Sequence, residues 1–176
     1  MHGSVPRGLA ATGPSSMQLS NILPQDCIVV DVKGDQITSK MTAIHLLASL
    51  LAPKLEVAPQ EVEQHLLERE QLQSSAIGEG VAISHAAMER INVRAAALLL
   101  CPRGVEFDSI DGEPVRIIFG VVGPRQATAE HLKVLARISR LLRDVETRKR
   151  LLEAADSSTA RNLVVQEDGE FRGTGV

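Results

Sequence analysis

Aromatic side chains are almost absent from this chain of 176 residues: they make up 2% of it, and neither Trp nor Tyr occurs. Proteins that bind single-stranded nucleic acid stack the bases on such rings, so this platform is missing. The formal net charge is −3, which leaves no overall basic field to attract a phosphate backbone or an anionic membrane. We therefore expect no nucleic-acid partner, and a core built from the aliphatic residues that dominate the 44% hydrophobic content.

Cysteine and long apolar runs are scarce as well. Cys27 and Cys101 are isolated and have neither C-x-x-C spacing nor the density of a disulfide framework, so we expect reduced thiols in the core. The longest apolar run, residues 95–101, is far shorter than the roughly 20 residues of a membrane-spanning helix. These absences predict a cytoplasmic protein without direct membrane insertion.

The two ends of the chain differ in composition from its middle. Residues 1–16 contain scattered Gly, Pro and Ser, a stretch at 5–8 that resembles a protease site, and no apolar segment of the kind that a signal peptide needs. We interpret them as an expression-tag remnant and Met17 as the natural start. Residues 17–166 are expected to form one domain, and residues 167–176, rich in Gly and charge, a flexible tail.

Apolar spacing predicts two helices in the first half of the chain. Residues 39–52 place apolar side chains on one helical face, with a Thr-Ser pair as the cap and Pro53 just past the end. A second helix begins at Pro59, a residue that the first helical turn accepts, and frays near Gln73. This helix therefore carries Arg69 in its last turn.

Strands fill the middle of the chain, and further helices follow. Apolar runs of strand length, bounded by turn residues, lie at 81–83, 93–101, 105–107 and 114–122. Helices are predicted at 128–143, with Thr128 as the N-cap, at 146–155, and over a short segment from Ser157. The strands are too clustered for a strictly alternating doubly wound fold. We predict an α/β fold of the α+β sandwich type, with one mixed β-sheet flanked by helices.

His85 is the first candidate for a functional residue. It follows the short run 81–83 in a Gly-flanked segment, which we expect to leave the imidazole accessible. A neutral imidazole, with an ordinary pKa of about 6.5, is a competent nucleophile toward phosphorus. A transferring phosphoryl group also needs a cation and neutral donors nearby, and Arg69 offers a planar guanidinium. The loop before the strand offers hydroxyl and main-chain donors from Ser74, Ser75, Gly78 and Gly80.

His131 is the second candidate, in the first turn of the predicted helix 128–143. The positive end of a helix dipole disfavours an imidazolium, so this ring is expected to stay neutral and to donate one N–H to a phosphate. Structural alternatives stay open for both supporting residues. His131 can be a buried packing residue on an apolar face, and Arg69 a solvated cation at a helix C-terminus.

Two segments of the chain resemble the signatures of one protein family. The first runs from Leu67-Glu68-Arg69-Glu70 through Ile77-Gly78-Glu79-Gly80-Val81-Ala82-Ile83-Ser84-His85-Ala86, and the second from Glu130-His131-Leu132-Lys133-Val134-Leu135-Ala136-Arg137 through Leu141-Leu142-Arg143-Asp144. Both resemble the enzyme IIA domains of the phosphotransferase system (PTS), fructose/mannitol class. Within that class the nitrogen-regulatory member is the nearest. The resemblance covers residues 17–166.

The resemblance implies a role for each candidate. His85 would accept a phosphoryl group from a small histidine phosphocarrier protein, and His131 and Arg69 would flank the phosphohistidine. Such a chain would be a transferase-like phosphocarrier, and no metal or organic cofactor is implied. For nitrogen-regulatory members the output is control of other proteins, such as a sensor kinase or a potassium transporter.

Three positions depart from the usual pattern of the family. Ser84 stands where Pro usually precedes the acceptor, and its hydroxyl could donate to a phosphate; Ala76 replaces a Gly, and Glu79 a small or neutral residue. A carboxylate beside a phosphate would be repulsive. Two alternatives therefore stay open: an interaction module of the same fold with weak or no phosphorylation, and a sugar-uptake enzyme IIA that passes the phosphoryl group to a membrane permease.

Overall fold

The computed structural model describes residues 17–173, and the predicted tag remnant at 1–16 lies outside them. Five α-helices lie in the described part of the chain: α2 (Lys40–Leu55), α3 (Pro59–Leu72), α4 (Thr128–Arg143), α5 (Val145–Leu152) and α6 (Ser157–Gly173). Two short 3-10 helices, η2 (Leu19–Asn21) and η3 (Gln25–Cys27), precede them. The strands are β1 (Ile28–Val30), β2 (Ala76–Gly78), β3 (Val81–Met88), β4 (Ala95–Val105) and β5 (Val115–Pro124). No helix in this range is both long and apolar enough to cross a membrane.

The five strands form one mixed sheet in the order β1-β4-β5-β3-β2. The pairs β1–β4 and β3–β5 are parallel, whereas β4–β5 and β2–β3 are antiparallel. The central strands β4 and β5 are buried along most of their length, as expected for a sheet covered on both faces. The predicted mixed sheet flanked by helices is thereby confirmed.

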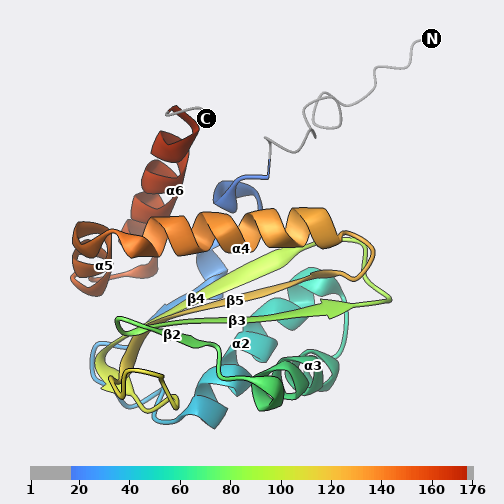
Figure 1. Ribbon diagram of the computed structural model, residues 1–176, viewed down its shortest axis with the longest axis horizontal. Coiled ribbons are helices and arrows are strands. Elements are labelled where there is room, and N and C mark those ends of the chain that lie inside the picture. Colours follow the sequence, from blue (N-terminus) through green and yellow to red (C-terminus); the bar gives the residue numbers. More distant parts are fainter. Residues whose placement is uncertain (1–16, 174–176) are drawn as a thin grey trace.

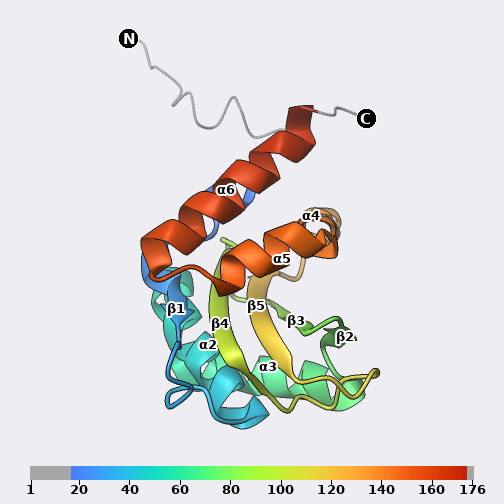
Figure 2. The ribbon, with the colours of Figure 1, turned by 90° about the vertical axis from the view of Figure 1, so that its left-hand side faces the viewer.

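Helices cover the sheet on both faces (Figures 1 and 2). α2 and α3 lie on one face, and α4, α5 and α6 on the other. Side chains alternate along a strand, so β4 sends Ala97 and Leu99 into the core under α2, and Leu98 and Leu100 into the core under α4. Each face of the sheet therefore has its own aliphatic core.

Local sequence explains where the first two helices begin. Ser39 caps α2 in a reciprocal capping box with Thr42, and α3 starts at Pro59, as predicted. The predicted end of the first helix is wrong, because Pro53 lies inside α2. Its ring costs one helical hydrogen bond, but the burial of Ala52 and Leu55 holds the last turn in place.

The C-terminal segment corrects a second prediction. Residues 167–173 belong to α6 and not to a flexible tail. Asp168 is 1% exposed, and its carboxylate accepts the main-chain N–H of Leu19 at 2.9 Å and the Nε–H of Arg137 at 2.8 Å. These contacts join segments far apart in the sequence, so the composition of the C-terminus could not reveal them.

Candidate functional site

His85 lies within β3, not after it, because the strand continues to Met88 beyond the predicted run 81–83. Val81 and Ile83 belong to the core under α4, and the period of two places His85 on the same face of the sheet. Its Nδ1 is 3.2 Å from the carbonyl oxygen of Ile83. Since a carbonyl only accepts, Nδ1 carries the proton in this contact, and Nε2 keeps its lone pair.

His131 faces His85 from the first turn of α4. Their ring centroids are 5.6 Å apart with the planes inclined by 50°. His131 is 9% exposed, and burial lowers its pKa to about 4, with the charges of Arg94 and His85 acting in the same direction. Burial also lowers the pKa of His85 below 6.5. The site therefore presents two neutral imidazoles at pH 7, one half-buried and one almost fully buried.

Arg69 lies in the last turn of α3, as predicted. The residue is partly exposed, and Nη1 donates a long hydrogen bond of 3.4 Å to the carbonyl of Gln73. Its charge contributes to lowering the pKa of His85, so the guanidinium lies close enough for electrostatic coupling to that ring. The structure thus brings Arg69, His85 and His131 to one end of β3.

Ser74 and Ser75 differ in what their hydroxyls do. The hydroxyl of Ser74 donates to the carbonyl of Phe107 at 2.8 Å and accepts the N–H of Ala76, so it holds the chain in place. Ser75 directly precedes β2, and its carbonyl accepts the N–H of Ile83, which extends the Ala76–Ala82 pairing by one residue and places Ser75 on the face of Ile83 and His85. Its hydroxyl is buried and has no hydrogen-bond partner. Ser75 is the serine that remains free to donate to a ligand.

Three other predicted site residues lie away from His85. Ser84 is 1% exposed and points to the opposite face, between Ala82 and Ala86 of the other core. Gly78 and Gly80 form the turn between β2 and β3, with φ angles of 95° and 76°. The strand from Gly80 to His85 spans about 17 Å, so this turn cannot hold a phosphate on that ring.

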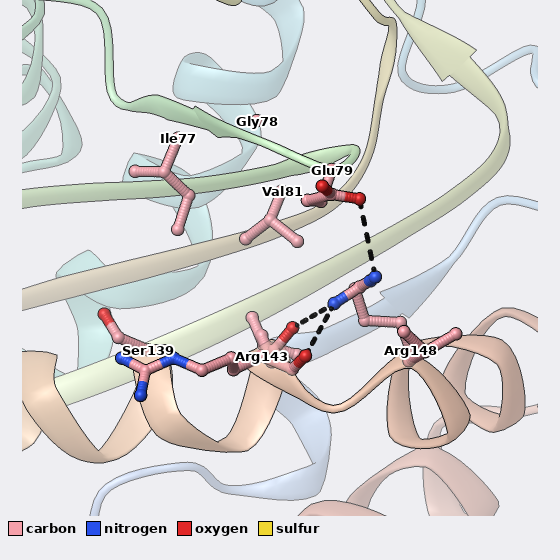
Figure 3. Close-up of a pocket in the computed structure, with 9 residues that line it drawn as sticks. Ile77, Gly78, Glu79, Val81, Ser139, Arg143 and Arg148 are labelled. Carbon is pink, nitrogen blue, oxygen red and sulfur yellow. Dashed lines mark hydrogen bonds and ion pairs between the residues drawn. The ribbon is translucent and has the colours of Figure 1, made fainter. Parts of the chain in front are cut away.

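The turn at the far end of β3 borders a cleft of about 470 Å³ beside the junction of α4 and α5 (Figure 3). Glu79 reaches over it to Arg148, whose Nη2 lies 3.6 Å from the carboxylate. Nη1 of Arg148 donates to the carbonyls of Leu142 and Arg143 at the end of α4. The carboxylate of Glu79 is therefore paired with a cation far from His85, and it does not repel a phosphoryl group there.

Sequence reasoning missed two residues beside the site. Glu70 is 9% exposed; its carboxylate is 2.7 Å from Nζ of Lys40 and accepts the N–H of Ser75 at 3.0 Å. Arg94 donates from Nη2 to the carbonyl of Ala127 at 3.1 Å, next to His131 in α4. The available sequence signals were a carboxylate in the last turn of a helix, for Glu70, and a cation directly before an apolar run, for Arg94.

The architecture and the paired histidines define a class: a mixed sheet between two helical layers, with two neutral imidazoles meeting at one strand end. Residues 21–167 match the family described as phosphoenolpyruvate-dependent sugar phosphotransferase system, EIIA 2. The chain belongs to this family, which confirms the resemblance seen in its sequence.

Known relatives agree in fold and, in part, in name. A nitrogen regulatory protein from Bradyrhizobium diazoefficiens is 34% identical over 148 residues, which are 84% of this chain and 95% of that protein. The crystal structure of nitrogen regulatory protein IIA-Ntr from Neisseria meningitidis is similar with a TM-score of 0.76 and 30% identity, over 82% of this chain and 97% of that one. The fructose-specific EIIABC component of Bacillus subtilis is 31% identical over 86% of this chain, but over 24% of its own length.

Proposed function

We propose that this chain is a cytoplasmic regulatory domain of a phosphoenolpyruvate-dependent phosphorelay, in which His85 accepts a phosphoryl group from a small histidine phosphocarrier protein. One observation carries the proposal: His85 and His131 meet at 5.6 Å, and the Nδ1 of His85 is tied to the carbonyl of Ile83. The sequence does not decide which ring nitrogen of His85 reacts. We assign Nε2, because Nδ1 carries the proton and Nε2 alone keeps a lone pair.

The transfer follows from this geometry. The lone pair of His85 Nε2 forms the new N–P bond, while the N–P bond of the donor breaks and its electron pair stays on the donor imidazole. The phosphoryl group passes from the donor imidazole to His85, and the donor nitrogen regains its lone pair. The second nitrogen of each ring does not change its protonation state. Charge spreads over the phosphoryl oxygens during this step, and donors that are already in place stabilise it without reorganisation. We assign this role to Arg69, to His131 and to the hydroxyl of Ser75, which has no hydrogen-bond partner.

The regulatory output is supported by the rim of the site and by the relatives. Leu72 is 81% exposed near Arg69, and Leu132 is 61% exposed beside His131. Exposed apolar side chains beside a reactive group suit transient protein partners, and phosphorylation changes the charge at the centre of such a surface. The name of the Bradyrhizobium relative, a nitrogen regulatory protein, favours regulation. The partner classes that the family resemblance implies, a sensor kinase or a potassium transporter, remain our expectation.

Two observations bear on the alternatives. Ser84 faces the opposite core and Glu79 is paired with Arg148, so neither departure from the family pattern places an obstacle at His85. This favours a phosphorylated domain over a module that has lost phosphorylation. Sugar uptake is the second candidate, and the fructose-specific relative supports it.

Intact-mass measurement tests the proposal. The chain is incubated with phosphoenolpyruvate, the phosphocarrier protein and the enzyme that charges this carrier. We expect one acid-labile phosphoryl group on the wild type and none on His85→Ala. Ser84→Ala is the matched control, because it changes the neighbouring residue on the opposite face of the same strand, and it should be labelled like the wild type. A wild type that stays unmodified, while another member of the family is labelled, contradicts the proposal.

A further inference from the structure

Arg94 lies at the start of β4 and is joined to His131 through a single carbonyl group. Nη2 of Arg94 donates to the carbonyl oxygen of Ala127 at 3.1 Å, and the main-chain N–H of His131 donates to the same oxygen at 3.0 Å. The guanidinium is therefore anchored to the first turn of α4, which carries the second histidine of the site.

The neighbouring strand leaves room for this guanidinium. A Cβ atom on Gly123 of β5 would lie 2.5 Å from Nε of Arg94 and 2.7 Å from Nη2. Such contacts are too close for any side chain, so the arginine rests directly on the backbone of β5. A larger residue at position 123 would have to displace this guanidinium from its hydrogen bond to Ala127.

Arg94 and His131 each carry a buried polar atom without a hydrogen-bond partner. In the described part of the chain the side-chain atoms of this kind are Ser75 Oγ, Arg94 Nε and His131 Nδ1. A guanidinium N–H can only donate, whereas an imidazole nitrogen accepts when the proton sits on the other nitrogen. The buried donor Nε and the buried ring nitrogen Nδ1 thus belong to the two residues that share the Ala127 carbonyl. An unprotonated Nδ1 is the state that complements the cation.

We propose that Arg94 is a positioning residue for phosphoryl transfer, which keeps Nδ1 of His131 unprotonated so that Nε2–H of this ring is the group that donates to the phosphoryl group on His85. The inference rests on the proposed function of His85. It gives the two rings complementary states, since Nε2 of His85 carries the lone pair and Nε2 of His131 carries the proton.

The charges around His131 act in this direction. After burial, Arg94 is the larger of the two charged influences that lower the pKa of His131, and His85 is the other. Glu130, in the same turn of α4, opposes the effect of burial on Arg94 and helps to keep the guanidinium charged. Neutralising Arg94 should therefore let His131 take up a proton more easily.

Imidazole ¹⁵N NMR on the unphosphorylated full-length protein measures this state directly. In the wild type we expect His131 to be neutral at pH 7 with the proton on Nε2. In Arg94→Met we expect its pKa to rise from about 4 toward the ordinary 6.5, and the phosphoryl-transfer rate to fall about tenfold, which corresponds to about 1.4 kcal/mol. Arg94→Lys keeps the charge but loses the planar guanidinium. It should therefore restore most of the low pKa of His131 but less of the phosphoryl-transfer rate. Arg90→Met, at an exposed position before the same strand, is the matched control and should change neither.

Two results would overturn the proposal: a wild-type His131 with its proton on Nδ1, or a folded Arg94→Met protein whose His131 keeps its tautomer and pKa. The first needs no variant, so it decides the matter even where Arg94→Met does not fold. Both readouts use unphosphorylated protein. A wild type that is never phosphorylated would refute the proposed function of His85. The NMR measurement would still show whether Arg94 sets the tautomer and pKa of His131.

Discussion

The two ends of β3 carry parts of the same family signature, and they are built in opposite ways. At the Gly80 end, polar groups are paired: Asp111 accepts the N–H of Glu79, and the carbonyl of Gly80 accepts the N–H groups of Arg116 and Ile117. At the His85 end, Ser75 Oγ and His131 Nδ1 are buried without partners. Unpaired buried polar groups are costly unless a ligand uses them. Ser75 Oγ is a donor that a phosphoryl oxygen can use, whereas an unprotonated His131 Nδ1 complements the charge of Arg94, so the difference separates a structural turn from a reactive site.

The largest effect should come from removing the second histidine. His131→Ala is expected to lower the rate of phosphoryl transfer to His85 about 100-fold, the lower range for a preorganised hydrogen-bond donor to developing charge. Arg148→Ala, at the other end of the strand, should leave the rate unchanged. Single-turnover transfer from the charged phosphocarrier protein measures both. Equal rates for wild type and His131→Ala would show that the ring has a packing role only.

Acid should weaken the His131 end of the fold. Its pKa is about 4 in the folded protein, against an ordinary value of 6.5. As the pH falls from 6.5 to 4, the unfolded chain binds a proton that the folded chain does not, so the free energy of unfolding decreases. The slope approaches about 1.4 kcal/mol per pH unit for one proton. His131→Asn should lose this part of the pH dependence, as urea unfolding at several pH values would reveal; an unchanged dependence would contradict the low pKa.

The turn end should respond in stability and not in rate. Gly80 has a φ of 76°, and a Cβ there would meet only ordinary contacts, the nearest being the carbonyl of Pro114 at 3.6 Å. Gly80→Ala should therefore cost about 1–2 kcal/mol through its backbone conformation alone. Urea unfolding measures this loss, and the folded fraction should be phosphorylated at the wild-type rate. A slower rate in the folded fraction would show that the two ends are coupled.

Sequence predicted one end of β3 better than the other, for physical reasons. The amphipathic spacing of α4 and the first-turn proline of α3 located His131 and Arg69 on their helices. Residues 81–88 are mostly small and apolar on both faces, so no alternation marked where the strand ended or on which face Ser84 lay. Gly78 and Gly80 were near His85 in sequence but about 17 Å away along an extended strand. The partners of Arg94 and Asp168 depend on distant segments and could not be predicted from local patterns.

The smallest effect, and the most selective, is expected at Ser75. Its hydroxyl is buried without a partner, whereas its main-chain N–H is held by Glu70 and its carbonyl accepts the N–H of Ile83. Ser75→Ala keeps both main-chain bonds and removes an unsatisfied group, so stability should stay constant or rise by about 1 kcal/mol. If the hydroxyl donates to the phosphoryl group, the transfer rate should fall roughly threefold to tenfold, the range of one neutral hydrogen bond. Ser74→Ala is the matched control with the reverse result, because the hydroxyl of Ser74 binds Phe107: it should lose stability and keep its rate once folded. A Ser75→Ala protein that loses stability at an unchanged transfer rate would show that Ser75 has a structural role. Ser75 would then resemble the paired polar groups at the Gly80 end of the strand.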